Sequence, residues 1–313
     1  MGRWATQWSS ISGVLLLMKK VLVTLLTSHD IRRFARLVKS CMAIEAAPQI
    51  ELVPIIVVNT TNDAYYREVI ACNFPYPVIR TESNGWPGKG KNSCSDIFLK
   101  SDADFLLQMD GDDFFYPSCG RSLSGILNRY GGSLDVLGLY PTDKVTLQRL
   151  NCGYEFEWSN PQYTKLHGTC WTTSITWPSN CMPGPRRGEW WDKELPTSQN
   201  TIYIRSKKSC KYRFPEDIPN GEDALLGTIL LAEHQQGAIN YYVSMSSDFY
   251  LYDEVVENSI QKQEPWRNWV EIWKERVGNI LSANRSNFME LPVIYQDLQI
   301  TGAEKEAWIK EHY

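Results

Sequence analysis

The sequence predicts an α/β protein in which a Rossmann-like, mostly parallel central sheet is flanked by helices. Strand-like apolar runs alternate with helix-like stretches through the first third of the chain, and each run is continuously β-branched or leucine-rich. Strands that are buried on both faces have this composition, and strands joined through helices pair in parallel. With 313 residues, 43% of them hydrophobic, the chain can bury the core that this architecture needs.

The first part of the chain supplies four expected strands and four expected helices. The strands are expected at 20–28, 51–61, 76–82 and 104–110. The helices are expected at 30–46, 62–72, from about 92 to 100, and at 118–130. The first helix is amphipathic, because its apolar residues recur at helical spacing. A glycine-rich loop precedes the third helix.

The alternation fades in the second half, where fewer elements can be placed. Short strands are expected at 169–176, 201–206 and 241–245. A helix is expected at 220–237, with Glu222 and Asp223 in its first turn and Gly237 as its C-terminal stop. A helix from 265 to about 281 follows, and the capping box from Thr301 to Glu304 opens a terminal helix.

Three regions are expected along the chain. Residues 1–17 fit no fold pattern and are expected to be a leader or a non-native start, because Met18 followed by "KKVLVTLL" is a natural chain start. Residues 18–262 form the α/β domain, and residues 263–313 form a C-terminal helical extension. Lys19 and Lys20 break the apolar run near the start into pieces too short to span a membrane, so no transmembrane segment is expected.

Charge and cysteine content exclude some classes of function. The net charge of −4 gives no basic footprint for nucleic acid, so no nucleic-acid partner is expected. The eight cysteines are widely spaced and form no C-x-x-C pair, so they indicate neither a zinc ribbon nor a thioredoxin-type site. Reduced thiols in a cytoplasmic protein are the expected state.

Three carboxylates end the fourth expected strand, in "DFLLQMDGDD". Asp110, Asp112 and Asp113 would repel one another unless a cation lies between them, and carboxylates are the ligands that Mn²⁺ and Mg²⁺ prefer. Ligands of such folds bind outside the carboxyl ends of the strands. A calcium EF-hand fails, because Pro117 and Arg121 would stand at ligand positions. An exposed acidic turn is the structural alternative.

The segment "NGWPGKGKNS" at 84–93 is a second candidate. Gly85, Gly90 and Lys91 nearly fit a phosphate-binding P-loop, but Asn92 replaces its hydroxyl and Pro87 removes a backbone donor. Loop amides, lysines and a helix N-terminus still favour an anion. A solvent-exposed turn is the alternative.

The segment "RFPEDIPNGEDALLG" at 213–227 is the third candidate. Glu222 and Asp223 in the first turn of a helix complement its dipole, an effect worth from a few tenths to about 1 kcal/mol each. Alternatively, a carboxylate fixed there could serve as a general base that takes a proton from a hydroxyl.

Together, "VLVTLLTS", "IIVVNTTND", "GKGKNSCSDIFLKSDADFLLQMDGDD" and "FPEDIPNGEDALLG" resemble the GT-A fold of the inverting family 2 nucleotide-sugar glycosyltransferases, over about residues 20–260. The resemblance implies that Asp112 and Asp113 hold Mn²⁺ or Mg²⁺ against the diphosphate of a UDP-, GDP- or dTDP-sugar donor. It implies that Asp223 is the catalytic base, with Glu222 beside it contacting the acceptor.

The resemblance also implies further contacts with the donor. They come from strand ends and from the start of the third helix: Thr27, Asn59, Lys91, Asn92 and Asp110. Asn59 stands where the family has an aspartate that reads the base, and Asp63 is the candidate substitute. The late histidine that the family often supplies to the metal is missing from 249–261, which leaves Asp253 or only water and phosphate as the third ligand.

The expected activity is the transfer of a single sugar to a hydroxyl of a glycan or other acceptor, because the Q-x-x-R-W motif of processive synthases is absent. A metal-dependent sugar nucleotidyltransferase is one alternative, although "TLLTSHDIRR" lacks the glycine that its first loop needs. A non-catalytic carbohydrate-binding protein is another. Tryptophans in 154–191 could stack on sugars or pack in the core. Those after Pro265 indicate docking onto the domain or, alternatively, a membrane-surface or subunit contact.

Overall fold

The computed structural model describes residues 18–139, 202–219, 221–244, 248–251, 292–294 and 302–312, and the single positions 272, 275, 276, 279 and 300. Several expectations fall outside these residues: the leader at 1–17, the aromatic segment 154–191 with its strand, Asp253, and most of the helix at 265–281. The boundaries of the three expected regions therefore stay predictions.

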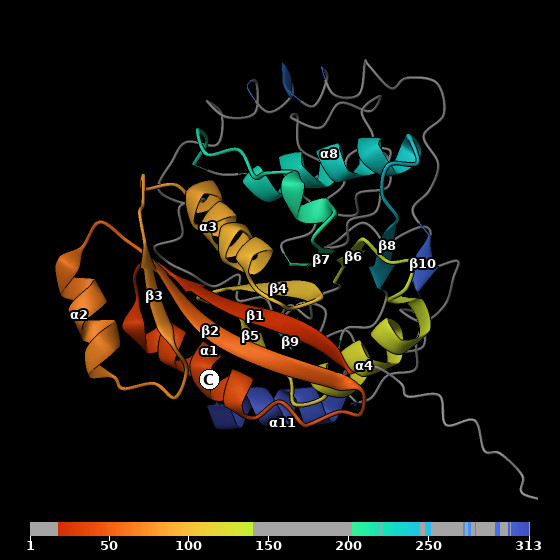
Figure 1. Ribbon diagram of the computed structural model, residues 1–313. Coiled ribbons are helices and arrows are strands. Elements are labelled where there is room, and N and C mark those ends of the chain that lie inside the picture. Colours follow the sequence, from red (N-terminus) through yellow and green to blue (C-terminus); the bar gives the residue numbers. More distant parts are fainter. Residues whose placement is uncertain are drawn as a thin grey trace, which may run out of the picture.

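The described residues form one eight-stranded sheet and one two-stranded sheet (Figure 1). The order in the large sheet is β10-β8-β6-β7-β4-β1-β2-β3. Its strands are β1 (Lys19–Thr27), β2 (Ile50–Asn59), β3 (Val78–Thr81), β4 (Phe105–Asp110), β6 (Val136–Gly138), β7 (Tyr203–Ser206), β8 (Tyr241–Ser244) and β10 (Val293–Ile294). All but β7 run in one direction, which confirms the mostly parallel sheet.

Helices cover both faces of the large sheet (Figure 1). One face carries α1 (Ile31–Met42), α2 (Asp63–Ala71) and α4 (Cys119–Tyr130), and the other carries α3 (Pro87–Lys100) and α8 (Glu222–Gln235). A short 3-10 helix, η4 (Ser209–Lys211), follows β7. Side chains of β1 alternate between the faces: Val23 and Leu25 pack with α1 and α4, whereas Leu22 and Leu26 pack with α3. This alternation explains the continuous apolar runs in the sequence.

The small sheet pairs β5 (Phe114–Phe115) with β9 (Tyr250–Leu251) in antiparallel fashion. The terminal helix α11 (Gly302–His312) packs beside this pair and confirms the helix expected at the C-terminus. In the described part of the chain, no helix has the length and apolar character needed to cross a bilayer.

The structure corrects several element boundaries. The third helix begins at Pro87 instead of about residue 92, so most of the expected glycine-rich loop is helical. Proline is well suited to the first turn, because its fixed φ matches the helix and its missing N–H is not needed there. The first helix ends at Met42 instead of residue 46. Strands β5, β6, β9 and β10 were not predicted, because two or three residues are too few to show a periodic pattern.

Candidate functional site

The aspartate turn, Asp110 to Asp113, follows β4 directly. Asp110 pairs with Leu26 in the parallel register of β4 and β1, and the Asp113 N–H donates to the Asp110 carbonyl over 3.3 Å. Between them, a Cβ on Gly111 would lie 2.7 Å from the Leu26 carbonyl oxygen and 3.5 Å from Thr27. Glycine is therefore required for the turn to rest against the end of β1, beside Thr27.

Burial and like charge raise the pKa of two carboxyl groups of this turn, those of Asp110 and Asp112. Burial first, and then the negative charge of Asp110, raise the pKa of Asp112 to about 6. Burial also raises the pKa of Asp110, because the opposing effect of Lys91 does not fully offset it. Asp113 is only 1% exposed. A nearby cation would lower these pKa values, so the donor set fits a hard divalent cation such as Mn²⁺ or Mg²⁺.

The turn alone does not complete a coordination sphere. Across the described residues, no group of three His, Cys, Asp or Glu side chains is arranged to hold a metal. If Asp112 and Asp113 supplied two carboxylates to a metal, as the sequence predicts, further ligands would have to come from water, from a bound phosphate or from residues outside the described ranges.

Lys91 links the aspartate turn to the start of α8. Its Nζ lies 3.2 Å from Asp110 Oδ2 and 2.8 Å from Glu222 Oε1. Burial lowers the pKa of this ammonium, but the carboxylates of Asp110, Glu222 and Asp223 outweigh burial and hold it well above its usual value. Lys91 is therefore charged at neutral pH, and it joins residues that are far apart in the sequence.

The first turn of α8 presents the predicted catalytic carboxylates. Gly221 begins the helix with φ of 79°, a left-handed conformation that favours glycine. The Tyr203 hydroxyl donates to the Asp223 carbonyl over 3.2 Å, which fixes the turn against β7. Glu222 is 6% exposed, whereas Asp223 is only partly buried. Of the two carboxylates, Asp223 is the one that an incoming molecule could reach.

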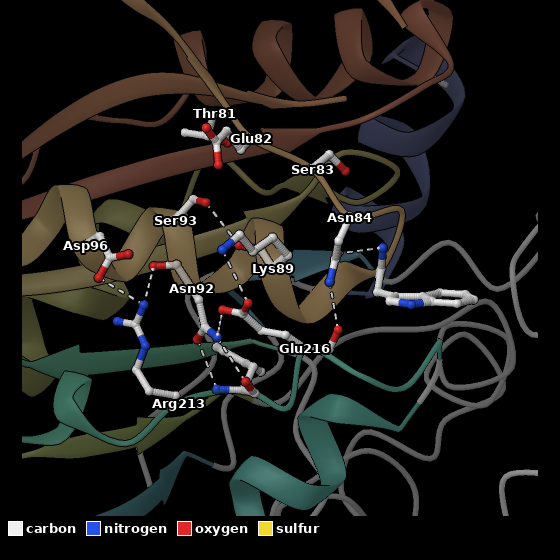
Figure 2. Close-up of polar contacts among 12 residues, drawn as sticks. Thr81, Glu82, Ser83, Asn84, Lys89, Asn92, Ser93, Asp96, Arg213 and Glu216 are labelled. Atoms are coloured by element: carbon white, nitrogen blue, oxygen red, sulfur yellow. Dashed lines mark hydrogen bonds and ion pairs between the residues drawn. The ribbon is translucent and has the colours of Figure 1, made fainter. Parts of the chain in front are cut away.

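Helix α3 is fastened to the segment 213–216, which precedes this turn (Figure 2). The amide of Asn92 donates to the Phe214 carbonyl over 2.9 Å and to Glu216 Oε1 over 2.7 Å, and its oxygen accepts from the Phe214 N–H over 3.0 Å. Lys89 pairs with Glu216 at 3.3 Å, and Asn84 donates to the Glu216 carbonyl over 2.8 Å. These contacts hold the beginning of α8 over α3.

Close packing explains why the segment 84–93 is rich in glycine. A Cβ on Gly88 would lie 1.9 Å from the Pro215 carbonyl oxygen, and one on Gly90 would lie 3.2 Å from the Asn59 side chain. The glycines thus let the helix approach its neighbours and do not form a phosphate-binding loop. Lys91, expected to favour an anionic ligand, instead pairs with two carboxylates of the protein.

Thr27 lies at the carboxyl end of β1, where the sequence placed it. Its Oγ1 forms a short hydrogen bond with the Tyr65 hydroxyl, which also donates to the His29 carbonyl over 3.0 Å. Burial raises the pKa of Tyr65 to about 12, so the phenol stays protonated and can donate. The tyrosine fixes the loop that follows β1.

Asn59 and Asp63 are separated by the structure. Asn59 donates to Thr81 Oγ1 over 2.9 Å and to the Glu82 carbonyl over 2.7 Å, so it joins the ends of β2 and β3. Asp63 lies on α2, pairs with Arg80 and keeps 74% of its side chain exposed. Asp63 therefore points toward β3 and solvent, which does not favour it as the substitute base reader.

Two residues near the site were missed by the sequence analysis. Tyr65 supports Thr27, and Glu216 receives both Asn92 and Lys89. Glu216 lies in "RFPEDIP", a segment that was singled out, but nothing in the pattern distinguishes its role from that of Asp217. Tyr65 lies 38 positions from Thr27, and Glu216 lies 124 positions from Asn92, so no local pattern reports these contacts.

Comparison with solved structures identifies the fold. The chain superposes on S. aureus TarS 1-349 in complex with UDP-GlcNAc with a TM-score of 0.54 and 14% identity, over 94% of this chain and 71% of that one. Two further structures of TarS 1-349 are matched over only 60% of their length. The mostly parallel sheet and the likeness to TarS confirm the predicted GT-A fold.

Other similar structures match more weakly. Mannosyltransferase PcManGT from Pyrobaculum calidifontis, in complex with GDP-Man and Mn²⁺, gives a TM-score of 0.46 at 11% identity, over 85% of this chain and 64% of that one. Glucosyl-3-phosphoglycerate synthase from Mycobacterium tuberculosis, in complex with Mg²⁺ and UDP, gives 0.46 at 11% identity, over 88% of each chain. No protein-family model and no curated protein matches the sequence.

Proposed function

We propose that this protein is a metal-dependent glycosyltransferase that moves a single sugar from a nucleotide-sugar donor to an acceptor hydroxyl, with inversion. The observation that carries the proposal is the buried contact of Lys91 with both Asp110 and Glu222. This contact supports the proposal because it joins a strand-end aspartate turn to the start of a helix that begins with two carboxylates. A metal-bound donor and a general base need this proximity.

The proposal assigns the carboxylates different tasks. Asp112 and Asp113 would hold Mn²⁺ or Mg²⁺, which when bound neutralises charge on the leaving nucleoside diphosphate. Asp223, the more exposed carboxylate of α8, would accept the proton of the acceptor hydroxyl. Glu222 is buried against Lys91, so we assign it to holding the helix start in place rather than to contacting the acceptor.

The donor would lie at the carboxyl ends of β1, β2 and β4, where ligands of such sheets bind. Thr27, Asn59 and Asp110 end these strands. TarS 1-349 was crystallised with UDP-GlcNAc, so we take that sugar nucleotide as the first donor to test. We also propose a cytoplasmic setting, which is supported by the free thiols of the cysteines that the structure describes.

A thermal-shift panel of UDP-, GDP- and dTDP-sugars, with and without Mn²⁺, tests the proposal. A donor at 100 times its dissociation constant stabilises the folded state by about 2.7 kcal/mol, which is easily detected. We expect one nucleotide class to raise the melting temperature only with Mn²⁺, and Asp112→Ala to abolish that rise.

If none of the donors raises the melting temperature, the proposal is contradicted. If a donor does raise it, the reaction product distinguishes a glycosyltransferase from a nucleotidyltransferase. Release of nucleoside diphosphate from a sugar nucleotide indicates a glycosyltransferase. Pyrophosphate released from a nucleoside triphosphate would instead indicate a nucleotidyltransferase.

A further inference from the structure

Helix α11 packs against the strand that continues the aspartate turn. Trp308 and Ile309 of this helix lie against a small buried cluster formed by Phe114, Tyr116 and Leu251. In Figure 1, α11 lies on the same side of the large sheet as α1 and α4. A helix from the far C-terminus thus covers β5, which begins directly after Asp113.

Two polar contacts fix the orientation of α11 against the cluster. The Trp308 indole donates from Nε1 to the Phe115 carbonyl over 3.1 Å. Lys305 pairs with Asp248 at 3.1 Å, and both side chains are 0% exposed. Breaking a buried pair leaves an uncompensated charge, so the pair strongly favours the docked position of α11 once it has formed.

The backbone of Phe115 is held from two helices. Its N–H donates to Ser40 Oγ of α1 over 3.0 Å, while its carbonyl accepts from Trp308 of α11. Phe115 also pairs with Tyr250 of β9. Since Phe115 stands two residues after Asp113, these contacts limit how far the carboxylates of the turn can move.

The ribbon formed by β5 and β9 is tied to the same helix. The Tyr116 N–H donates to the Phe249 carbonyl over 3.1 Å, and Ser118 Oγ donates to the Asp248 carbonyl over 3.0 Å. Asp248, which precedes β9, in turn pairs with Lys305, and Leu251 of β9 belongs to the cluster against which α11 packs. Helix α11 therefore contacts both sides of the ribbon.

We propose that Trp308 and Lys305 are positioning residues that hold the aspartate turn in the geometry needed to bind a divalent cation with a nucleoside diphosphate. The identity of the ligand rests on the proposed function, whereas the claim that α11 orders the aspartate turn does not. Residues that orient metal ligands without touching the metal commonly affect metal affinity about 10- to 100-fold when they are replaced. Neither residue belongs to the segments that resemble the glycosyltransferase family, so sequence motifs do not report this role.

Trp308→Phe is the test variant, because it removes the indole donor and keeps an aromatic ring in the cluster. Glu311→Gln, at an exposed position of the same helix, is the matched control. Val69→Ala removes two methyl groups from the buried core on α2, leaves both polar contacts of α11 intact, and controls for a general loss of stability.

Two measurements are made on the full-length protein. Hydrogen exchange of the amides in 110–116 reports the order of the turn without any ligand. Calorimetry with Mn²⁺ and UDP reports the affinity of the site. We expect Trp308→Phe to speed exchange in 110–116 and to weaken Mn²⁺-dependent UDP binding about tenfold, whereas Glu311→Gln and Val69→Ala change neither.

The outcomes separate this inference from the proposed function. Unchanged exchange in 110–116, or faster exchange with unchanged UDP affinity, would overturn the positioning role. A similar loss of affinity in Val69→Ala would also overturn it, because the effect would then follow from stability alone. If the unaltered protein binds no UDP with Mn²⁺, the proposed function fails, while the exchange data still decide whether α11 orders the turn.

Discussion

The ammonium of Lys91 lies 2.8 Å from Glu222 Oε1, with only 5% and 7% of the two side chains exposed. The residues belong to helices α3 and α8, and 131 positions of sequence separate them. Through Lys91, the start of α8 is bonded to Asp110 at the end of β4. The two halves of the proposed active site are thus joined by one buried cation.

Replacing Lys91 with an uncharged residue should lower the free energy of unfolding. Lys91→Met leaves the carboxylates of Asp110 and Glu222 without their partner, and breaking a buried pair typically destabilises by about 3–5 kcal/mol. We expect a loss of this size in the free energy of unfolding, measured by urea denaturation with the metal removed.

Lys89→Met is the control, because Lys89 stands on the same helix and pairs with Glu216 near the surface, where the two side chains are 35% and 38% exposed. Exposed pairs are worth about 0–1 kcal/mol. Equal losses in Lys91→Met and Lys89→Met would show that the buried cation has no special role.

A second prediction concerns the packing of α3 against the segment before α8. Gly88→Ala places a Cβ 1.9 Å from the Pro215 carbonyl oxygen, so either the helix or the segment must shift. We expect a destabilisation of about 1–3 kcal/mol, as for overpacked cores. A Cβ on Gly132 would meet nothing within 4 Å, so Gly132→Ala should be near neutral in the same denaturation series. A neutral Gly88→Ala would contradict the close approach.

The raised pKa of Asp112 predicts a pH-dependent stability. Because its pKa is about 6 when folded and near 3.8 ordinarily, protonated Asp112 favours the folded state. This contribution is fully present below about pH 4 and is lost as the pH rises through 6. The protonated carboxyl of Asp112 therefore contributes at most about 3 kcal/mol to the free energy of unfolding.

Asp112→Asn removes this titration, so without metal we expect the variant to be more stable than the unaltered protein at pH 7.5. At pH 4.5 the difference should shrink. Saturating Mn²⁺ should stabilise the unaltered protein more than the variant. A stability difference that is the same at both pH values would rule out the raised pKa.

Much of the fold could be predicted from the sequence, because the strands of the first half are long and apolar. The position of the aspartate turn follows from the end of "DFLLQM", and the start of α8 from "NGED". Both predictions depend on local patterns that one element carries by itself. The helix expected at 220–237 is accordingly observed as Glu222–Gln235.

The contacts inside the site could not be read in the same way. "GKGKN" was interpreted as part of a glycine-rich loop, whereas it is helical. Its glycines allow close approach between segments, and the local sequence does not reveal this role. Glu222, which pairs with Lys91, and Phe214, which pairs with Asn92, lie more than 120 positions away from them. The docking of α11 likewise depends on Trp308 and Lys305, whose partners belong to other elements.

Glycosyl transfer with Asp223 as general base can be measured as the release of nucleoside diphosphate from a sugar nucleotide in the presence of Mn²⁺, for the unaltered protein and for Asp223→Asn. A positioned general base typically contributes about 10²–10⁴-fold to the rate. We expect release by the unaltered protein and a loss of at least about 100-fold in Asp223→Asn, with donor affinity retained. A fully active Asp223→Asn would remove this residue from the mechanism, and no release from any donor would contradict the claim itself.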